Sequence, residues 1–410
     1  MTLGVGSAFA DTVDPTPIPV GLAPAGVAIT PDGGRAYITN WGAGTVSVIS
    51  TSDNTVTATV DVGTFPQDVA ITPDGLRAYV TNRGSNSVSV INTSNNTVDP
   101  TPIAVGVAPS SLAITPDGSR AYVTQWEGTV SVINTADNTV TTAPVPGGEG
   151  LWGMAFTPDG LRAYVTNRIN GTVSVINTAD NTMVGAPITV GTTPSSVAII
   201  PDGGRAYVVN QESNSVSVIN TSNNTVDPTI GVGGHPYGMA FTPDGDRAYV
   251  ANPDDSTVSV IDTSKNTVTA TIALPAGGLP SALAITPDGL RAYVSNWNTG
   301  TVSVIAIGDA PTLTGIPAAG VLGQPYTHTF TLTGQPAPTV TAVGALPDGL
   351  TLTEAGVLSG TPTEAGTFAV TFTASNGIGT PAVLDATVTI TAAPEPPATG
   401  SLGSLGNFGS

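Results

Sequence analysis

The stretch Pro73-Asp74-Gly75-Leu76-Arg77-Ala78-Tyr79 recurs through the first three quarters of this chain in the form Pro-Asp-Gly-x-Arg-Ala-Tyr. Seven copies follow one another at spacings of 42 to 44 residues, with the Asp at Asp32, Asp74, Asp117, Asp159, Asp202, Asp244 and Asp288. A period of this length with strand-like contents is typical of radial β-repeats, because one four-stranded unit cannot bury both of its faces without neighbours.

The repeat from Phe65 to Gly106 indicates how one unit is built. Residues 69–72, 77–82, 87–92 and 97–105 have the composition of four short strands, joined by turns such as Pro73-Asp74-Gly75. The fourth strand contains prolines, which an edge strand tolerates. Each repeat is therefore predicted to be a four-stranded antiparallel blade of a β-propeller.

The two ends of the repeat array complement each other. The last unit, residues 281–307, supplies only three strands, whereas residues 11–21 nearly duplicate residues 96–106, which form a fourth strand. We therefore predict that strand 12–20 pairs beside strand 301–306. This pairing closes a ring of seven blades and removes the exposed edges.

The segments Ala78-Tyr-Val-Thr-Asn82 and Ala163-Tyr-Val-Thr-Asn167 lie within Ile/Phe-Thr-Pro-Asp-Gly-x-Arg and Thr/Ser-Val-Ser-Val-Ile-Asn-Thr contexts. Through these segments, the part of the chain from about residue 11 to residue 307 resembles the YVTN-repeat β-propeller family. The resemblance implies a secreted or surface-layer protein of bacteria or archaea, and it implies no particular reaction, because the fold alone does not assign one.

The period stops near Ala310, and residues 311–391 contain alternating runs suited to a β-sandwich. Leu346-Pro-Asp-Gly-Leu350 and Gly356-Val-Leu-Ser-Gly-Thr-Pro362 resemble the immunoglobulin-like domains of bacterial surface proteins, which are related to cadherin-like modules. That relation makes calcium a weak alternative to the expectation of no cofactor. The local acidic residues are scattered: Asp348, Glu354, Glu364 and Asp385.

The expected fold is all-β, with a seven-bladed propeller at 11–308, an immunoglobulin-like sandwich at 310–392 and a flexible tail at 393–410. Residues 1–10 end in Ala8-Phe9-Ala10, which matches the cleavage site of a secretory signal peptide. They are either the remnant of such a signal or an apolar N-terminus that resembles one by chance. We expect an extracellular or cell-surface bacterial protein.

Composition narrows the set of partners. The net charge of −19 with a single Lys and no basic stripe argues against nucleic acid as a ligand. The absence of Cys excludes disulfides and thiolate metal sites. No segment has the length and hydrophobicity of a transmembrane helix, and we expect a monomer.

Residues that recur in every blade are expected to have a structural role in the blade and not a role in a single site. We interpret the motif Asp as a turn residue, the motif Arg as a local partner and the motif Tyr as packing between blades with its hydroxyl hydrogen-bonded. Departures from the repeat are more informative, and they gather in two loop types that share one face of a meander. The candidate ligand-binding residues on that face are Trp41, Arg83, Trp126, Trp152, Arg168, His235, Tyr237, Asp254 and Trp297.

Exposed aromatic and charged side chains are typical of a recognition surface for a protein or carbohydrate ligand. The alternative is that the Trp rings only cap the blades. We expect a non-catalytic binding, adhesion or scaffold protein, because the chain has two His, too few for a copper site, and no nucleophile elbow. The alternative function is a propeller oxidoreductase or lactonase-like hydrolase with a site over the central channel, with His235 near Asp254 as its base.

Overall fold

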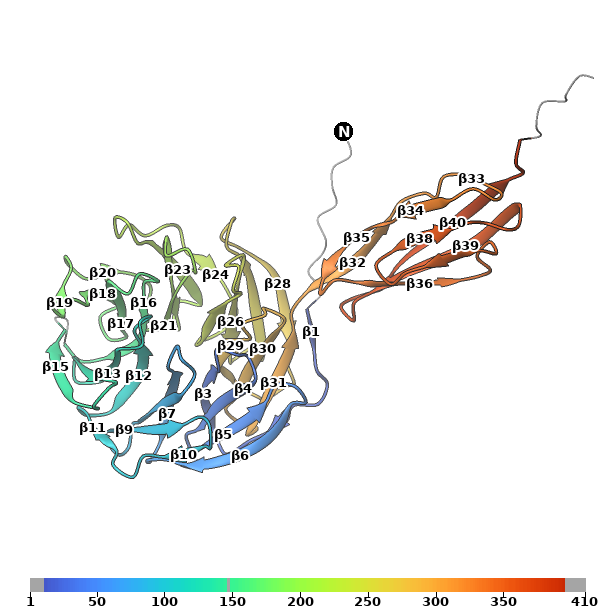
Figure 1. The fold of residues 1–410 in the computed structure, drawn as a ribbon. Helices are drawn as coiled ribbons and strands as arrows, with labels where there is room; N and C mark the ends of the chain where they lie inside the picture. The colour runs from blue at the N-terminus through green and yellow to red at the C-terminus, as the bar shows by residue number, and fades with distance from the viewer. Residues whose placement is uncertain (1–10, 146–147, 395–410) are drawn as a thin grey trace, which may run out of the picture. The chain divides into compact units, whose positions relative to one another are not determined.

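A computed structural model describes residues 11–145 and 148–394, and each regular element among them is a β-strand (Figure 1). The chain divides into two compact units, one of residues 11–307 and one that contains residues 308–394. The predicted signal remnant and most of the predicted tail lie outside the described residues. No helix that could cross a membrane occurs in the part of the chain that the structure describes.

The unit of residues 11–307 is a ring of seven antiparallel blades, as predicted (Figure 1). The innermost strands are β3 (Pro24–Ile29), β7 (Pro66–Ile71), β12 (Pro109–Ile114), β16 (Leu151–Phe156), β21 (Pro194–Ile199), β25 (Met239–Phe241) and β29 (Pro280–Ile285). The second strands are β4 (Arg35–Asn40), β8 (Arg77–Asn82), β13 (Arg120–Gln125), β17 (Arg162–Asn167), β22 (Arg205–Asn210), β26 (Arg247–Asn252) and β30 (Arg291–Asn296). The third strands are β5 (Thr45–Ser50), β9 (Ser87–Asn92), β14 (Thr129–Asn134), β18 (Thr172–Asn177), β23 (Ser215–Asn220), β27 (Thr257–Asp262) and β31 (Thr301–Ala306).

The outer strands are less regular than predicted. Continuous strands of five to seven residues occur as β6 (Thr55–Asp61), β15 (Val140–Pro144) and β28 (Thr267–Ala273), whereas the blade of β21 to β23 has only the two-residue β24 (Ile230–Gly231) and an isolated bridge at Val226. Three blades instead have a pair of two-residue strands: β10 (Thr97–Val98) with β11 (Ile103–Ala104), β19 (Thr182–Met183) with β20 (Ile188–Thr189), and β1 (Thr12–Val13) with β2 (Ile18–Pro19). The prediction of one continuous strand over 97–105 is wrong, because Pro100 and Pro102 have no N–H to donate to the ladder.

The N-terminal segment closes the ring as predicted. Thr12 pairs with Ala306 and Ile18 with Val302, so that β1 and β2 complete the blade of β29, β30 and β31. Each end of the repeat array is thereby tied to the other. The closing segment contributes Ile18 to the core between the last and the first blade.

The repeated Tyr and Arg residues join neighbouring blades. Each motif Tyr is fully buried, and in six blades its hydroxyl donates to an Asn in the outer turn of the next blade, as in Tyr164 to Asn224 Oδ1 at 3.0 Å. In the same six blades the motif Arg donates to a Thr carbonyl of that next turn, as in Arg162 to Thr221 at 2.9 Å. The interpretation of the Arg as a local partner covers only part of its role: Arg77, Arg120 and Arg291 also donate to the Tyr hydroxyl two residues along the strand, but the guanidinium of each motif Arg reaches the next blade as well.

The motif Asp has the predicted role as a turn residue. In the turn before β13, the Asp117 carboxylate accepts hydrogen bonds from the Thr115 hydroxyl and from Ser119 N at 3.0 Å. These bonds, with that of the Ser119 hydroxyl, lower the pKa of Asp117 to about 2. The carboxylate thus stabilises the tight turn that connects the first two antiparallel strands of the blade.

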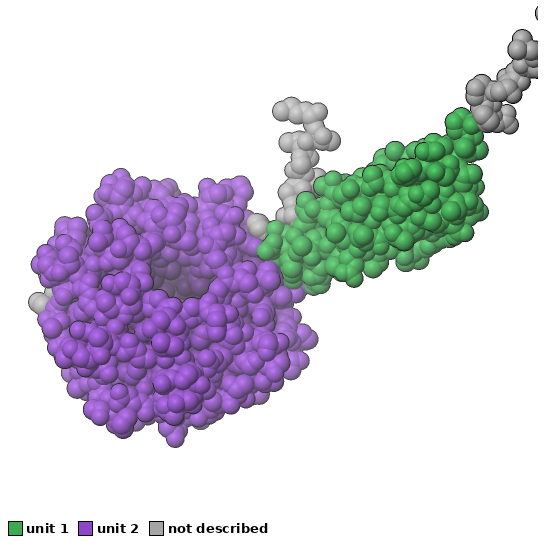
Figure 2. Space-filling view, viewed as in Figure 1, with its two compact units in different colours: residues 1–10, 308–410 green, residues 11–307 purple. Residues whose placement is uncertain are grey.

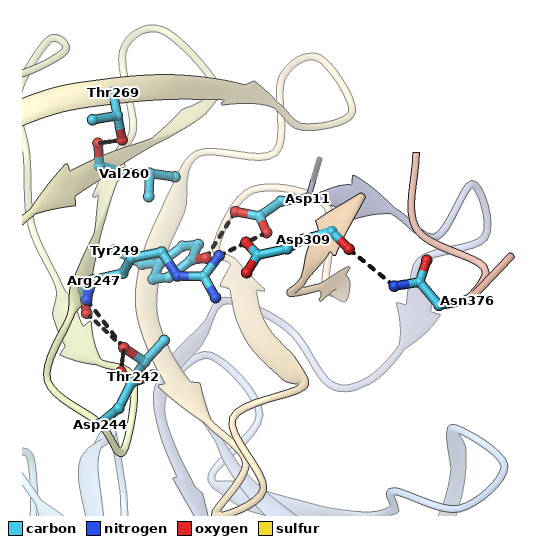
Figure 3. A network of polar contacts seen from close by, with 9 residues as sticks. All are labelled: Asp11, Thr242, Asp244, Arg247, Tyr249, Val260, Thr269, Asp309 and Asn376. Atoms are coloured by element: carbon cyan, nitrogen blue, oxygen red, sulfur yellow. Dashed lines mark hydrogen bonds and ion pairs between the residues drawn. The ribbon is translucent and has the colours of Figure 1, made fainter. Parts of the chain in front are cut away.

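The C-terminal unit is an immunoglobulin-like sandwich, as predicted. One sheet contains β33 (Gly320–Val321), β36 (Thr339–Val343), β39 (Gly366–Ser375) and β40 (Ala382–Thr391). Shorter sheets contain β34 (Tyr326–Thr329), β37 (Leu350–Leu352) and β38 (Val357–Gly360), and β32 (Asp309–Thr314) with β35 (Thr331–Gln335). Alternate residues of these strands form one core around Phe330, Leu358 and Phe372. Asn376 donates to the Asp309 carbonyl at 2.9 Å and fixes one end of the unit (Figure 3).

Candidate functional site

The middle of the ring is hollow, as Figure 2 shows for the unit of residues 11–307. Two residues of each blade form the wall of this channel. In six blades they are the second and third residues of the innermost strand, and in the remaining blade they are the two residues just before β25. These pairs are Ala25-Gly26, Gln67-Asp68, Ser110-Ser111, Trp152-Gly153, Ser195-Ser196, Tyr237-Gly238 and Ser281-Ala282. Most of them line a cavity of about 120 Å³.

Small residues at the second position of six of the seven pairs let neighbouring strands approach closely at the axis. A Cβ on Gly153 would lie 2.7 Å from the Ser195 carbonyl oxygen, and one on Gly238 would lie 2.5 Å from that of Ser281. Both glycines therefore allow a close backbone approach that an alanine would prevent. Each follows a large aromatic residue, Trp152 or Tyr237, that lines the same cavity.

Asp68 is the one acidic residue in the channel wall among the described residues. Its Oδ2 accepts hydrogen bonds from the Ser111 hydroxyl at 2.7 Å and from Leu112 N at 3.1 Å. Its Oδ1 accepts from Val69 N at 2.9 Å. Burial raises the pKa of Asp68 above its ordinary value, and these hydrogen bonds oppose that rise.

Five side chains at the channel mouth form what we call the mouth cluster: Arg83, Trp126, Trp152, Arg168 and Tyr237. The guanidinium carbons of Arg83 and Arg168 lie 5.0 and 4.5 Å from the ring centre of Trp152. The Trp152 ring also meets Trp126 and Tyr237 edge-on, with centroid distances of 6.1 and 6.4 Å. Two cations thus share one indole, an arrangement that the ring quadrupole favours.

Polar contacts hold the mouth cluster in place. Arg168 donates to Oε1 of Gln211, a buried residue that directly follows β22. Burial lowers the pKa of Arg168 and raises the pKa of Tyr237. The positive charge of Arg168 opposes the rise in the pKa of Tyr237. The Trp152 carbonyl accepts from the Thr124 hydroxyl at 2.6 Å, so the backbone that carries the indole is fixed by the neighbouring blade.

A second set of rings, which we call the aromatic trio, consists of Trp41, Phe65 and Trp297. Trp41 stacks on Phe65 with ring centroids 4.2 Å apart and an angle of 16° between the planes. Trp41 also contacts Trp297, with centroids 5.3 Å apart. Phe65 is 45% exposed, so the trio presents apolar surface to solvent.

A cavity of about 250 Å³ lies between residues of these two sets. Trp297 of the aromatic trio and Tyr237 of the mouth cluster both line it, together with Gln67, Gln211 and His235. The cavity therefore combines ring faces with amide and imidazole groups, a composition typical of small-ligand sites.

Three large residues at this face, Phe65, His235 and Leu279, have left-handed backbone conformations, with φ of 53°, 56° and 51°. Each immediately precedes the proline that begins a channel-lining segment. The same conformation occurs at the equivalent positions Ala23, Ala108 and Thr193, each also directly before a proline, so it belongs to the repeat and not to the candidate site alone. Two of the large residues at this position, His235 and Leu279, line the 250 Å³ cavity.

The structure brings eight of the nine sequence-predicted site residues into the mouth cluster, the aromatic trio or the cavity between them. Asp254 is exposed and does not line that cavity; its N–H donates to the Gly234 carbonyl at 3.3 Å. Trp152 was expected in a loop and instead lies inside β16. Gln67 and Gln211 were not predicted. Aligning the repeats could have identified Gln67, which begins the one channel pair without a small residue.

The fold and site together describe a seven-bladed β-propeller with an aromatic and cationic channel mouth, followed by an immunoglobulin-like domain. Residues 310–392 match the protein family described as "Putative Ig domain". No curated protein matches the chain. The resemblance of the repeats to the YVTN-repeat family stays a prediction.

Two solved structures resemble the chain over its propeller-sized part. One is titled "Kuenenia stuttgartiensis Hydrazine Synthase": it has a TM-score of 0.64 and 24% identity, with 72% of this chain and 99% of that chain covered. The other is titled "Streptogramin B lyase structure": it has a TM-score of 0.62 and 15% identity, with 73% of this chain and 98% of that chain covered.

These titles correct one expectation. A synthase and a lyase share this fold, which contradicts the prediction that the protein is not an enzyme. The prediction depended on the lack of a His cluster and a nucleophile elbow, and neither is required for every chemistry that a propeller channel can hold. At these identities the likeness shows the fold and assigns no reaction.

Proposed function

We propose that this protein is a secreted or cell-surface protein whose propeller binds a glycan at the channel mouth. The observation that carries the proposal is the pairing of the mouth cluster with the aromatic trio around one cavity. Indole and phenol rings have an electron-rich face that attracts the C–H groups of a sugar ring. The amides of Gln67 and Gln211 provide donors and acceptors for hydroxyl groups beside those faces.

Other features agree with this proposal. Rings in a binding surface lose little conformational entropy on binding, which favours them as anchors. The Ser111 hydroxyl and the backbone of the channel wall extend the polar surface below the cavity. The immunoglobulin-like domain and the expected signal remnant support a location outside the cell.

The test compares the full chain with a variant that carries Trp41→Ala, Trp126→Ala and Trp297→Ala. We expect wild-type protein to bind members of a panel of soluble oligosaccharides in isothermal titration, and the variant to lose that binding with its thermal midpoint changed by only a few degrees. Unfolding of the variant would instead assign the Trp rings to blade capping. A protein ligand with no oligosaccharide binding would overturn the glycan proposal.

One observation favours a second function, an enzyme with its site in the channel. Asp68 combines a raised pKa with a hydrogen bond to the Ser111 hydroxyl and a place in the wall of the cavity. A carboxyl with such a pKa is suited to proton transfer. Under this function, Asp68→Asn abolishes turnover of a bound oligosaccharide or lactone and leaves its binding intact, as measured by product analysis and titration.

A further inference from the structure

The two Arg residues of the mouth cluster differ from every other Arg in the propeller. The seven motif Arg side chains each bind a Thr carbonyl or, for Arg247, the Asp11 carboxylate. Arg83 and Arg168 interrupt the repeat, and they converge on the ring of Trp152. The repeat fold itself therefore does not require them.

Neither of these two cations has a carboxylate partner. Among the described residues the ion pairs are Arg247 with Asp11 and Lys265 with Asp262. Asp68, the acid of the channel wall, directs its oxygens to Ser111, Leu112 and Val69 instead. In a chain with 29 acidic and 10 basic residues, two unpaired guanidinium groups on one indole are a local exception to the charge of the whole protein.

Holding two like charges together without an ion-pair partner for either is unfavourable, and partial burial increases the cost. Burial lowers the pKa of Arg168 and the charge of Arg83 acts in the same direction, whereas Tyr237 and the carboxylate of Glu212 oppose the shift without forming an ion pair with Arg168. A bound anion would reduce this cost, and its oxygens would accept hydrogen bonds from the guanidinium N–H groups that it reaches. The planar fork of an Arg matches a carboxylate in particular, because two parallel N–H groups meet its two oxygens.

We propose that Arg83 and Arg168 bind the carboxylate of an acidic sugar, so that the ligand of the channel mouth is a glycan that contains uronic acid units. This inference rests on the proposed glycan function. Trp152 holds the two cations in position, and the cavity lined by Tyr237 and Trp297 receives the sugar ring that carries or neighbours the carboxylate. The aromatic trio supports the next unit of the chain.

The experiment titrates the full chain with trigalacturonic acid, with its neutral methyl ester, and with a sulfated neutral trisaccharide. We expect the acid to bind about 10- to 100-fold more tightly than the ester, the range for charge-assisted hydrogen bonds. Arg83→Gln and Arg168→Gln should each remove about tenfold of that preference, whereas Arg168→Lys should remove less. Lys265→Gln is the matched control, because it deletes one exposed cation in an outer turn.

Equal binding of acid and ester that is insensitive to both Arg variants would overturn the inference and leave the glycan function standing. Preference for the sulfated sugar would also overturn it, since the site would then select charge and not the carboxylate. Lack of binding of all three sugars, with no oligosaccharide of the wider panel bound either, would remove the proposed function and the inference together.

Discussion

The Tyr249 hydroxyl donates a hydrogen bond to Oδ2 of Asp11 across 2.7 Å, in the place where six other blades use an Asn (Figure 3). Asp11 lies where the outer turn of the seventh blade is interrupted by the two ends of the propeller. It also forms an ion pair with Arg247 at 3.5 Å, and both side chains are buried. One carboxylate thus replaces the Asn side chain and the Thr carbonyl that the other blades provide.

The first prediction follows from this replacement. Asp11→Ala leaves the buried Arg247 cation without its carboxylate and should lower the free energy of unfolding by about 3 kcal/mol. Asp11→Asn keeps an acceptor for Tyr249 and should cost about half as much. Denaturant titration of the full chain measures both. Wild-type stability in Asp11→Ala would contradict the assigned role of Asp11 in closing the ring.

Alkaline pH should destabilise the propeller through its buried tyrosines. Burial raises the pKa of Tyr207 to about 12 and raises that of five other motif Tyr residues. The folded state thus retains protons that the unfolded chain loses near pH ~10. This contribution to stability is complete below pH ~10 and is lost as the pH rises toward 12.

The measurement is the denaturant midpoint as a function of pH, for wild type and for Tyr207→Phe. The variant should be less stable below pH ~10 because it lacks the hydroxyl bond to Asn266, and it should lose less stability above that pH. Identical pH slopes for the two proteins would contradict the prediction.

Close packing at the channel axis makes Gly238 a sensitive position. Gly238→Ala should destabilise the propeller by about 1–3 kcal/mol, because its Cβ would lie 2.5 Å from a carbonyl oxygen of the next strand. Gly231→Ala is the control, since nothing lies within 4 Å of its Cβ, and it should stay within about 0.5 kcal/mol of wild type. Equal thermal midpoints for the two variants would show that the strands can move apart.

The pKa values of Asp68 and Asp117 should differ in opposite directions from the ordinary pKa of an Asp carboxyl group. Burial raises the pKa of Asp68, whereas turn hydrogen bonds lower that of Asp117 to about 2. Asp117 therefore contributes stability above pH ~4 that is lost as the pH falls toward 2, and Asp68 contributes in the opposite direction. Carbon-13 NMR of the carboxyl groups checks the order, and titration of Asp68 below Asp117 would contradict it.

The sequence predicted the ring well because a repeated residue has a repeated environment. Seven copies of one turn motif defined seven blades, and the near-duplicate at residues 11–21 located the closing strand. The outer strand is an exception, because Pro100 and Pro102 divide it into two short strands although its apolar residues continue the pattern. The contact of the motif Arg with the next blade is not predictable in this way, because it joins residues 58 positions apart in the case of Arg77 and Thr135, a separation that no local pattern encodes.

The candidate site was predictable as a face but not as a set of contacts. Two loop types of a meander must share one end of the blades, which grouped Trp41, Trp126 and Trp297 correctly on topology alone. The meeting of Trp152 with Tyr237 depends on the width of the ring and on side-chain rotamers, since their blades are not adjacent. The close approach of Arg83 and Arg168 to the indole of Trp152 likewise depends on the width of the ring and on side-chain rotamers.

The most direct test of the account is amide hydrogen exchange on the full chain with and without saturating trigalacturonic acid. Bound sugar should slow exchange in the segments of the channel mouth: 64–69, 125–128, 150–154, 208–212, 234–238 and 296–298. The Pro-Asp-Gly turns at the other end of the strands should exchange at unchanged rates. Protection confined to those turns or to residues 310–392 would contradict a ligand site at the channel mouth.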